Sequence, residues 1–291
     1  MPTETAGGSS TPAGDAVIAS ARLGEPDRYL AALLAPPAAR ADLLALAAFS
    51  SELARVPLLV TRERAMGEIR LQWWRDALEV PDGAARTGNP VADAVRATMR
   101  RCNLSPALLL DVIDAREVDL DQQPMPDDAA LTAYLWKTEG ALFALAAGLL
   151  HREAGGEVQA AAVAGGQAYG LARLLLGLPY ALARGRLPLP RSRLDAANVG
   201  SGELLSGEGG ANVAGILASL CAEARIALAT SRKHVADLPR PMRAAFLPLA
   251  LVETYLRALE RRGHDVLRSP VEIAPLTRVW RIAVAHWLGR T

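Results

Sequence analysis

Acidic residues are missing from one long stretch of this chain. Residues 158–194 contain no aspartate or glutamate, although the 291 residues include 31 acidic and 32 basic side chains in total. The stretch contains LLLGLPYALARGRLPLP, residues 174–190, in which an apolar run leads into a basic segment. Divalent ions such as Mg²⁺ take carboxylate oxygens as ligands. The stretch is therefore either apolar core or a site whose chemistry does not depend on a metal ion.

Other scarce features exclude further classes of protein. The two cysteines, Cys102 and Cys221, lie far apart in apolar contexts, so we expect buried free thiols and no disulfide framework. The net charge of +1 gives no footprint for nucleic acid, and zinc-finger and phosphate-loop patterns are missing, so no nucleic-acid partner is expected. The apolar runs at residues 141–150 and 171–182 are shorter than the roughly 20 residues of a membrane span.

The N-terminal segment MPTETAGGSSTPAGDAV is rich in Gly, Ser, Thr and Pro and lacks the basic start and apolar stretch of a signal peptide. We therefore predict a disordered leader over residues 1–20 and one folded domain over residues 21–291. A hydrophobic content of 51% is enough for a sizeable core. We expect a soluble protein of the cytoplasm.

Helical patterns dominate the rest of the chain. Alanine and leucine are abundant, apolar positions recur at spacings of three and four, and Pro and Gly punctuate the segments, so we predict an all-α protein. The predicted helices cover residues 26–35, 38–56, 62–80, 90–102, 105–121, 127–151, 157–183, 210–236, 240–262 and 272–288. The Gly/Ser-rich residues 198–212 are predicted to be a mobile connection within one domain.

Two helices carry unusual side chains. In MGEIRLQWWRDALE, residues 66–79, Trp73 and Trp74 point about 100° apart, so that one can be buried while the other lies against a neighbouring helix. In DVIDAREVDLD, residues 111–121, Asp111, Asp114 and Glu117 share a face. Such clustering is required of a metal site but is also typical of a solvated acidic face.

Lys137 is one of two lysines and lies in an apolar helix beside Tyr134 and Trp136. A buried cation needs a partner or an anionic ligand. The alternative is that its long side chain reaches the solvent.

Four segments together resemble the squalene/phytoene synthase family. They are RYLAALLAPPAARADLLALAAFSSELARV, GEIRLQWWRDAL, VDL followed by YLWKTEGAL, and GQAYGLARLLLGLPYALARGRLPLP, in this order over about residues 27–195. The resemblance implies an isoprenoid-synthase-like helical bundle with a central cavity. In active members of the family, two D-x-x-x-D motifs on facing helices hold Mg²⁺ against the diphosphates of two prenyl substrates.

Both metal motifs are degenerate in this chain. The resemblance places the first pair of aspartates at Ala54 and Leu58 and the second at Gly177 and Ala181. We expect the cavity to lie between the two helices that carry these four residues. No catalytic residue, metal ligand or cofactor is then expected; Mg²⁺ would be needed only if the chain were a transferase.

The pattern resembles a divergent branch of the family, the one that contains a complex I assembly factor with a squalene/phytoene-synthase-like domain. It implies a non-catalytic protein that binds an isoprenoid or lipid-like ligand or assists the assembly of a membrane complex with a protein partner. The alternatives are a transferase that condenses isoprenoid diphosphates with atypical residues, and an interaction protein with a filled core. The residues expected to hold a ligand are Tyr134, Lys137, Tyr169, Arg173, Tyr180, Arg184 and Arg186.

The last predicted helix, within residues 272–291, is amphipathic. It places Trp280, Ala283 and Trp287 on one side and arginines elsewhere. It is predicted either to cover the core or to make a peripheral contact with an anionic membrane surface.

Overall fold

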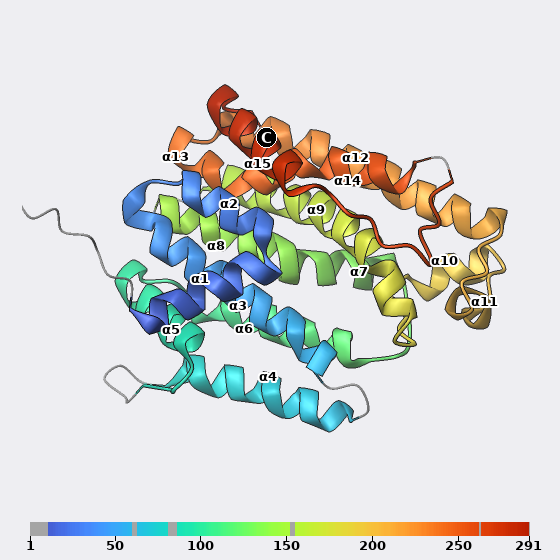
Figure 1. Ribbon diagram of the computed structural model, residues 1–291, viewed down its shortest axis with the longest axis horizontal. Coiled ribbons are helices and arrows are strands. Elements are labelled where there is room, and N and C mark those ends of the chain that lie inside the picture. Colours follow the sequence, from blue (N-terminus) through green and yellow to red (C-terminus); the bar gives the residue numbers. More distant parts are fainter. Residues whose placement is uncertain (1–10, 60–62, 81–85, 152–154, 262, 291) are drawn as a thin grey trace, which may run out of the picture.

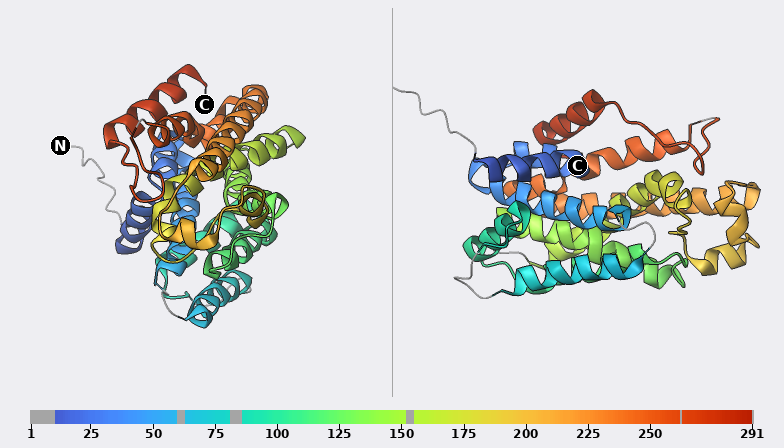
Figure 2. Two further views of the ribbon diagram at one scale, coloured as in Figure 1. Left: turned by 90° about the vertical axis from the view of Figure 1, so that its right-hand side faces the viewer. Right: turned by 60° about the horizontal axis from the view of Figure 1, so that its bottom comes forward.

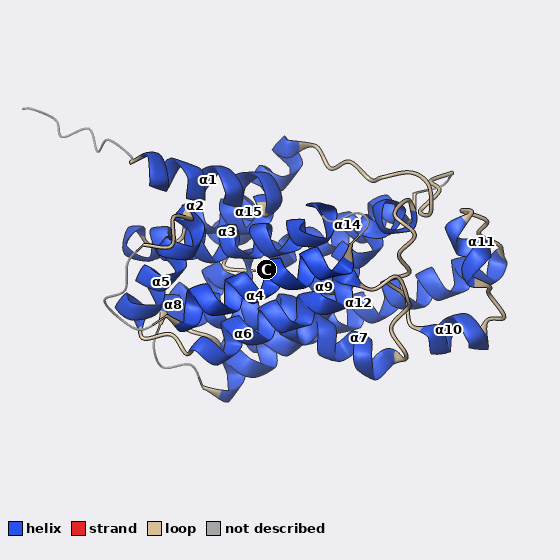
Figure 3. Cartoon of the chain, turned by 90° about the horizontal axis from the view of Figure 1, so that it is seen from below, coloured by secondary structure: helices blue, strands red, loops and turns tan. Residues whose placement is uncertain are grey.

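The computed structural model describes residues 11–59, 63–80, 86–151, 155–261 and 263–290, and this part of the chain contains helices and loops but no strand (Figure 3). The all-α prediction is therefore confirmed. The longer helices are α1 (Pro12–Gly24), α2 (Pro26–Leu34), α3 (Pro37–Leu59), α4 (Arg64–Glu79), α5 (Pro90–Cys102), α6 (Pro106–Ala115), α7 (Asp128–Leu135), α8 (Ala141–Leu150), α9 (Gly156–Leu182), α12 (Ala211–Asp237), α14 (Val252–Leu259) and α15 (Pro275–Leu288). The shorter ones are η1 (Arg116–Leu120), η2 (Trp136–Gly140), α10 (Arg191–Ala196), α11 (Ser201–Leu205), α13 (Arg240–Arg243) and η3 (Ala244–Leu251).

Helix α9 runs through the middle of the bundle, with α12 and α14 on one side of it and α4 at the far side, beyond α6 (Figures 1 and 2). Glycines allow its close approach to η2. A Cβ built on Gly166 would lie 2.5 Å from the Cα of Gly140, and one on Gly170 would lie 2.6 Å from the Leu135 side chain. The backbones of α9 and η2 therefore touch, which brings the polar side chains of both segments together.

Helix α12 packs along α9 through buried residues that recur at helical spacing. By length and composition α12 is the one described helix that could cross a membrane, with a mean hydropathy of 1.6. It was not singled out from the sequence because only uninterrupted apolar runs were considered. Its buried stripe, which includes Leu220, Ala224 and Leu228, also fits the core helix of a bundle.

The prediction of a disordered leader is wrong for residues 12–20, which belong to α1. The side chain of Thr11 accepts a hydrogen bond from the Gly14 amide, and Pro12 occupies the first turn, where a missing N–H costs nothing. Val17 and Ala21 are buried in the core, and α1 packs against α3. Residues 1–10 lie outside the described part of the chain.

The Gly/Ser-rich connection is also more structured than predicted. Residues 201–205 form α11, in which Leu204 is fully buried. The helix predicted to end at residue 56 continues through Pro57 in α3, and α9 likewise contains Pro179. A proline nitrogen has no hydrogen to donate, so each of these helices lacks one backbone hydrogen bond at its proline. Residues 81–85, which connect the helices predicted over 62–80 and 90–102, lie outside the described residues.

Three predicted helices are divided in the structure. The segment 105–121 continues from α6 into the 3₁₀ turn η1, and 240–262 divides into α13, η3 and α14. Within 127–151 the chain widens into a π-helical turn, η2. Such turns often occur at functional sites, and this one holds part of the candidate site.

Of the two adjacent tryptophans of α4, one is buried, as predicted. Trp74 is buried and packs edge-on against Phe49 of α3, with ring centroids 5.3 Å apart. The ring of Trp73 packs edge to face with that of Trp74, and the Trp73 side chain is 39% exposed.

Candidate functional site

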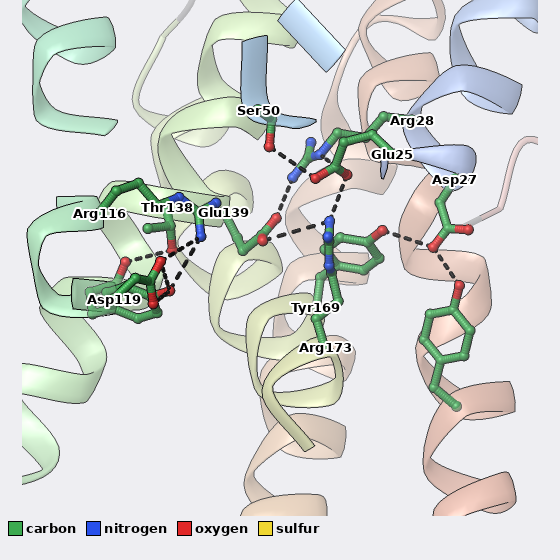
Figure 4. Close-up of polar contacts among 12 residues, drawn as sticks. Glu25, Asp27, Arg28, Ser50, Arg116, Asp119, Thr138, Glu139, Tyr169 and Arg173 are labelled. Atoms are coloured by element: carbon green, nitrogen blue, oxygen red, sulfur yellow. Dashed lines mark hydrogen bonds and ion pairs between the residues drawn. The ribbon is translucent and has the colours of Figure 1, made fainter. Parts of the chain in front are cut away.

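The centre of the site is a buried carboxylate, Glu139, on the π-helical turn η2 (Figure 4). Its Oε2 atom lies 2.6 Å from Nη2 of Arg28 on α2, and its Oε1 atom lies 3.8 Å from Nη1 of Arg173 on α9. Burial alone would raise the pKa of Glu139, but the positive charges of Arg173 and Arg28 outweigh it and hold the pKa at about 2. Glu139 is therefore a permanent anion at neutral pH.

A second buried carboxylate, Glu25, completes this cluster. Its Oε2 atom lies 2.6 Å from Nη1 of Arg173, and its Oε1 atom accepts a hydrogen bond of 2.9 Å from the Ser50 hydroxyl. Arg28 also lies 3.5 Å from Glu25 and covers the ring of Phe143, with 4.6 Å from its guanidinium carbon to the ring centroid. Both arginines of the cluster are thus paired with carboxylates.

Asp27 forms a neighbouring buried group. Tyr169 donates a hydrogen bond of 2.8 Å to its Oδ2 atom (Figure 4). The Tyr255 hydroxyl donates to the same oxygen. Arg278 of α15 lies 3.3 Å from the other oxygen. Burial raises the pKa of Asp27, and the two tyrosine hydrogen bonds partly offset this effect.

A third group surrounds Asp119 on η1. Arg186 lies 2.8 Å from Oδ1 and Arg116 lies 3.2 Å from Oδ2, while the Tyr134 hydroxyl donates a hydrogen bond of 3.0 Å to Oδ1. Burial raises the pKa of Tyr134, and the charge of Asp119 adds to that shift, so the phenol stays protonated at neutral pH. The Asp119 carboxylate therefore forms ion pairs with two arginines, Arg116 and Arg186.

A cavity of about 210 Å³ lies between the Asp119 group and the Glu139 cluster. It is smaller than the roughly 300–1,000 Å³ of pockets that enclose a typical small-molecule ligand. Charged side chains from η1, η2, α9 and the segments that follow η1 and α9 line it together with apolar side chains such as Leu135, Leu174 and Leu187. The lining residues are Arg116, Val118, Asp119, Asp121, Gln123, Met125, Tyr134, Leu135, Thr138, Glu139, Gly170, Arg173, Leu174, Gly177, Ala181, Arg186, Leu187 and Pro188.

The cavity lies against only one of the two helices that were expected to flank it. Gly177 and Ala181 line it, and nothing lies within 4 Å of a Cβ built on Gly177. Ala54 and Leu58 do not line it, and the Leu58 side chain is 47% exposed. The prediction was wrong on this side because η1 and the residues after it stand opposite α9.

Three of the seven predicted ligand residues line the cavity: Tyr134, Arg173 and Arg186. Tyr169 is buried beside Arg173 and faces Asp27. The other three lie outside the cavity. The ammonium group of Lys137 is on the surface, 2.9 Å from Asp111, while Tyr180 is exposed and Arg184 donates to the Tyr180 carbonyl.

The acidic stripe of residues 111–117 makes ion pairs between helices. Arg75 of α4 lies 2.6 Å from Asp114 and also pairs with Glu117, and Lys137 pairs with Asp111. All three acidic side chains are partly exposed, as expected for a solvated face. Among the described residues, no group of three His, Cys, Asp or Glu side chains could hold a metal ion.

Sequence reasoning missed Glu25, Asp27, Arg28, Arg116, Asp119 and Glu139. Asp119 and Glu139 lie in the segments VDL and YLWKTEGAL that carry the family resemblance, but in the second segment the predicted charged ligand residue is Lys137. One signal was present: residues two apart point to opposite sides of a helix, so Lys137 and Glu139 could not both face the core.

The fold is that of squalene synthases and their relatives. A squalene synthase HpnC from Alicyclobacillus acidocaldarius superposes with a TM-score of 0.72 at 18% identity, over 86% of this chain and 94% of that one. A dehydrosqualene synthase in complex with ligand superposes with a TM-score of 0.75 at 17% identity, over 95% and 96% of the two chains.

The family model of squalene/phytoene synthase matches residues 21–280, and the chain belongs to this family. Curated relatives are named "NADH dehydrogenase (ubiquinone) complex I, assembly factor 6". The rat protein is 28% identical over 248 residues, which cover 84% of this chain and 73% of the relative. The human protein is 26% identical over 245 residues, with the same coverage.

Proposed function

We propose that this chain is a non-catalytic member of the squalene/phytoene synthase family that serves the assembly of a membrane protein complex. Its cavity would hold one isoprenoid or lipid-like group. The proposal rests on the charges around the cavity. The arginines that line it form ion pairs with carboxylates of the same chain. Gly177 and Ala181 lie where metal-binding aspartates are expected.

Condensation of prenyl diphosphates requires negative charge to be stabilised on the leaving diphosphate. Metal ions or a dense group of cations can supply this stabilisation. Here Arg173 is held by Glu25, and Arg116 and Arg186 share Asp119. A diphosphate placed in the cavity would have to displace these carboxylates, at a cost of several kcal/mol for each buried charge left without its partner.

The cavity has room for an apolar group. At about 210 Å³ it accommodates part of one apolar chain beside Leu174, Leu187 and Met125, and an adjoining cleft of about 540 Å³ shares Asp119, Asp121, Gln123 and Arg186 with it. The names of the curated relatives favour assembly of complex I as the role, with a subunit of that complex as the protein partner. We expect the protein to work in the cytoplasm, at or near the membrane.

The enzymatic test is incubation of the purified protein with labelled farnesyl and geranylgeranyl diphosphates and Mg²⁺, followed by extraction of the products. The squalene synthase from Alicyclobacillus acidocaldarius serves as the positive control. We expect no coupled hydrocarbon from this chain. Metal-dependent formation of such a product would overturn the proposal and favour a transferase with atypical residues.

The assembly role is tested separately by deleting the gene in its source organism and measuring the amount of assembled complex I on native gels. We expect a deficit that the intact gene restores. The variant Asp119→Asn should restore assembly less well than Asp114→Asn, which changes a carboxylate outside the cavity. Normal complex I in the deletion strain would contradict the role.

A further inference from the structure

The C-terminal helix α15 has two different apolar faces. Its inner face packs on the body through Ile282 and Ala285, and Arg278 on that face reaches Asp27. Leu276 and Trp280 lie within about 40° of Trp287 on the opposite face, given 100° per residue. Their exposed fractions are 82%, 66% and 77%. Figure 1 shows α15 on the outside of the bundle, on the side away from α4. The outer stripe is therefore not needed to attach the helix to the core.

The charged side chains of α15 itself all have one sign. The sequence has no aspartate or glutamate from residue 273 to residue 291, whereas Arg281 and Arg290 are exposed there. A cleft of about 280 Å³ opens at the end of the helix beside Trp287. Its polar lining includes Arg240, Arg243, His286 and Arg290, and no carboxylate is among its lining residues in the described part of the chain.

We propose that α15 docks the protein on the surface of a bilayer that contains anionic lipids. Trp280 and Trp287 would enter the boundary between headgroups and acyl chains, where amphipathic tryptophan rings are enriched. Each basic residue near an anionic surface adds about 1 kcal/mol of attraction. The basic cleft beside Trp287 then receives a lipid phosphate. This inference does not depend on any ligand in the central cavity.

A bilayer fits these observations better than a protein partner because the exposed apolar side chains extend over three turns of one helix and have arginines, not carboxylates, beside them. Removal of the whole helix would be a poor test, since it would uncover the surfaces of α2 and η3 on which α15 packs and would take Arg278 away from Asp27. Substitutions on the outer stripe leave both contacts in place.

The test is sedimentation of the full-length protein with phosphatidylcholine vesicles, with and without phosphatidylglycerol. We compare wild type with Trp280→Ser/Trp287→Ser, Arg281→Gln/Arg290→Gln and the control Ile226→Ser, whose side chain is 68% exposed on α12. Wild type and control should bind the anionic vesicles, and the tryptophan variant should bind about tenfold more weakly or worse, the equivalent of 1.4 kcal/mol. The arginine variant should lose its preference for anionic vesicles.

A second measurement reports on the tryptophans themselves. Brominated lipids should quench the fluorescence of wild type, and Trp280→Phe/Trp287→Phe, which keeps the apolar stripe, should bind but lose most of the quenching. The proposal is overturned if wild type does not sediment with anionic vesicles, or if the Trp→Ser variant binds as well as wild type. Retention of quenching in the Phe variant would also overturn it.

Discussion

Arg28 and Glu139 are 111 residues apart in the sequence, and their Nη2 and Oε2 atoms lie 2.6 Å apart in the core. The pair joins α2 to the π-helical turn η2. Both side chains are buried, so neither charge can be solvated by water if its partner is removed. The pair therefore ties the N-terminal helices to the wall of the cavity.

We predict that Glu139→Gln lowers the free energy of unfolding by about 3 kcal/mol at pH 7, because Arg28 and Arg173 lose a buried anion. The pKa of Glu139 falls from 4.5 to about 2 on folding. The stabilisation is therefore complete above about pH 4.5 and is lost as the pH falls toward 2. Urea unfolding at pH 7, 4.5 and 3 should show the difference from wild type shrinking with acid. Glu157→Gln, at an exposed site, is the control; a difference that does not change with pH contradicts the prediction.

Gly166→Ala should destabilise the protein by about 1–3 kcal/mol, as overpacking of a close contact does. Its Cβ would lie 2.5 Å from the backbone of Gly140, which cannot move without displacing η2. The matched control is Gly177→Ala on the same helix, which has open space and should be neutral or stabilising by up to about 1 kcal/mol. Thermal unfolding of the two variants decides between the outcomes: equal melting temperatures would show that the contact between α9 and η2 can relax.

Asp119→Asn should create an anion site. The amide keeps the shape of the side chain but removes the negative charge that faces Arg116 and Arg186. We expect wild type to bind inorganic diphosphate weakly, with or without Mg²⁺, and the variant to bind it about tenfold more tightly, a gain of 1.4 kcal/mol. Titration calorimetry at low salt measures both. Asp114→Asn, which frees Arg75 outside the cavity, should not gain this affinity; tight binding by wild type would refute the idea of internally neutralised arginines.

Arg278→Gln should loosen α15 without unfolding the bundle. Its guanidinium lies 3.3 Å from Asp27, whose other oxygen is held by Tyr169 and Tyr255. Hydrogen exchange followed by mass spectrometry should become faster over residues 275–288 and stay unchanged over α9. Arg281→Gln, on an exposed position of the same helix, is the comparison. Uniformly faster exchange across the chain would show that the pair stabilises the whole fold instead.

The helices were predictable because their signals are local. Apolar residues at spacings of three and four, together with Pro and Gly at the ends, predicted most of the helices from α2 to α9. The family motifs predicted how the helices assemble into the fold. The buried charges were not predictable from local pattern. Glu25 precedes Pro26 in a sequence that resembles an ordinary helix start, and only the tertiary fold brings it within 2.6 Å of Arg173 on α9. Likewise, no spacing rule places η1 opposite Gly177. Tyr134, Arg173 and Arg186 were found because the motifs that carry the resemblance include them; their role in binding a ligand stays a prediction.

The wide turn at Trp136–Gly140 makes the length of this segment unusually constrained. A π-helical turn spans i to i+5, about one residue more than an α-helical turn. Loss of a single residue here would let the segment rewind into an α-helical turn, which keeps the facing of α7 and α8 but shifts the side chains within the turn. Lys137 could then not meet Asp111 on the surface while Glu139 meets Arg28 in the core. Deletions should therefore be selected against within these five residues more strongly than in the loops that connect the helices.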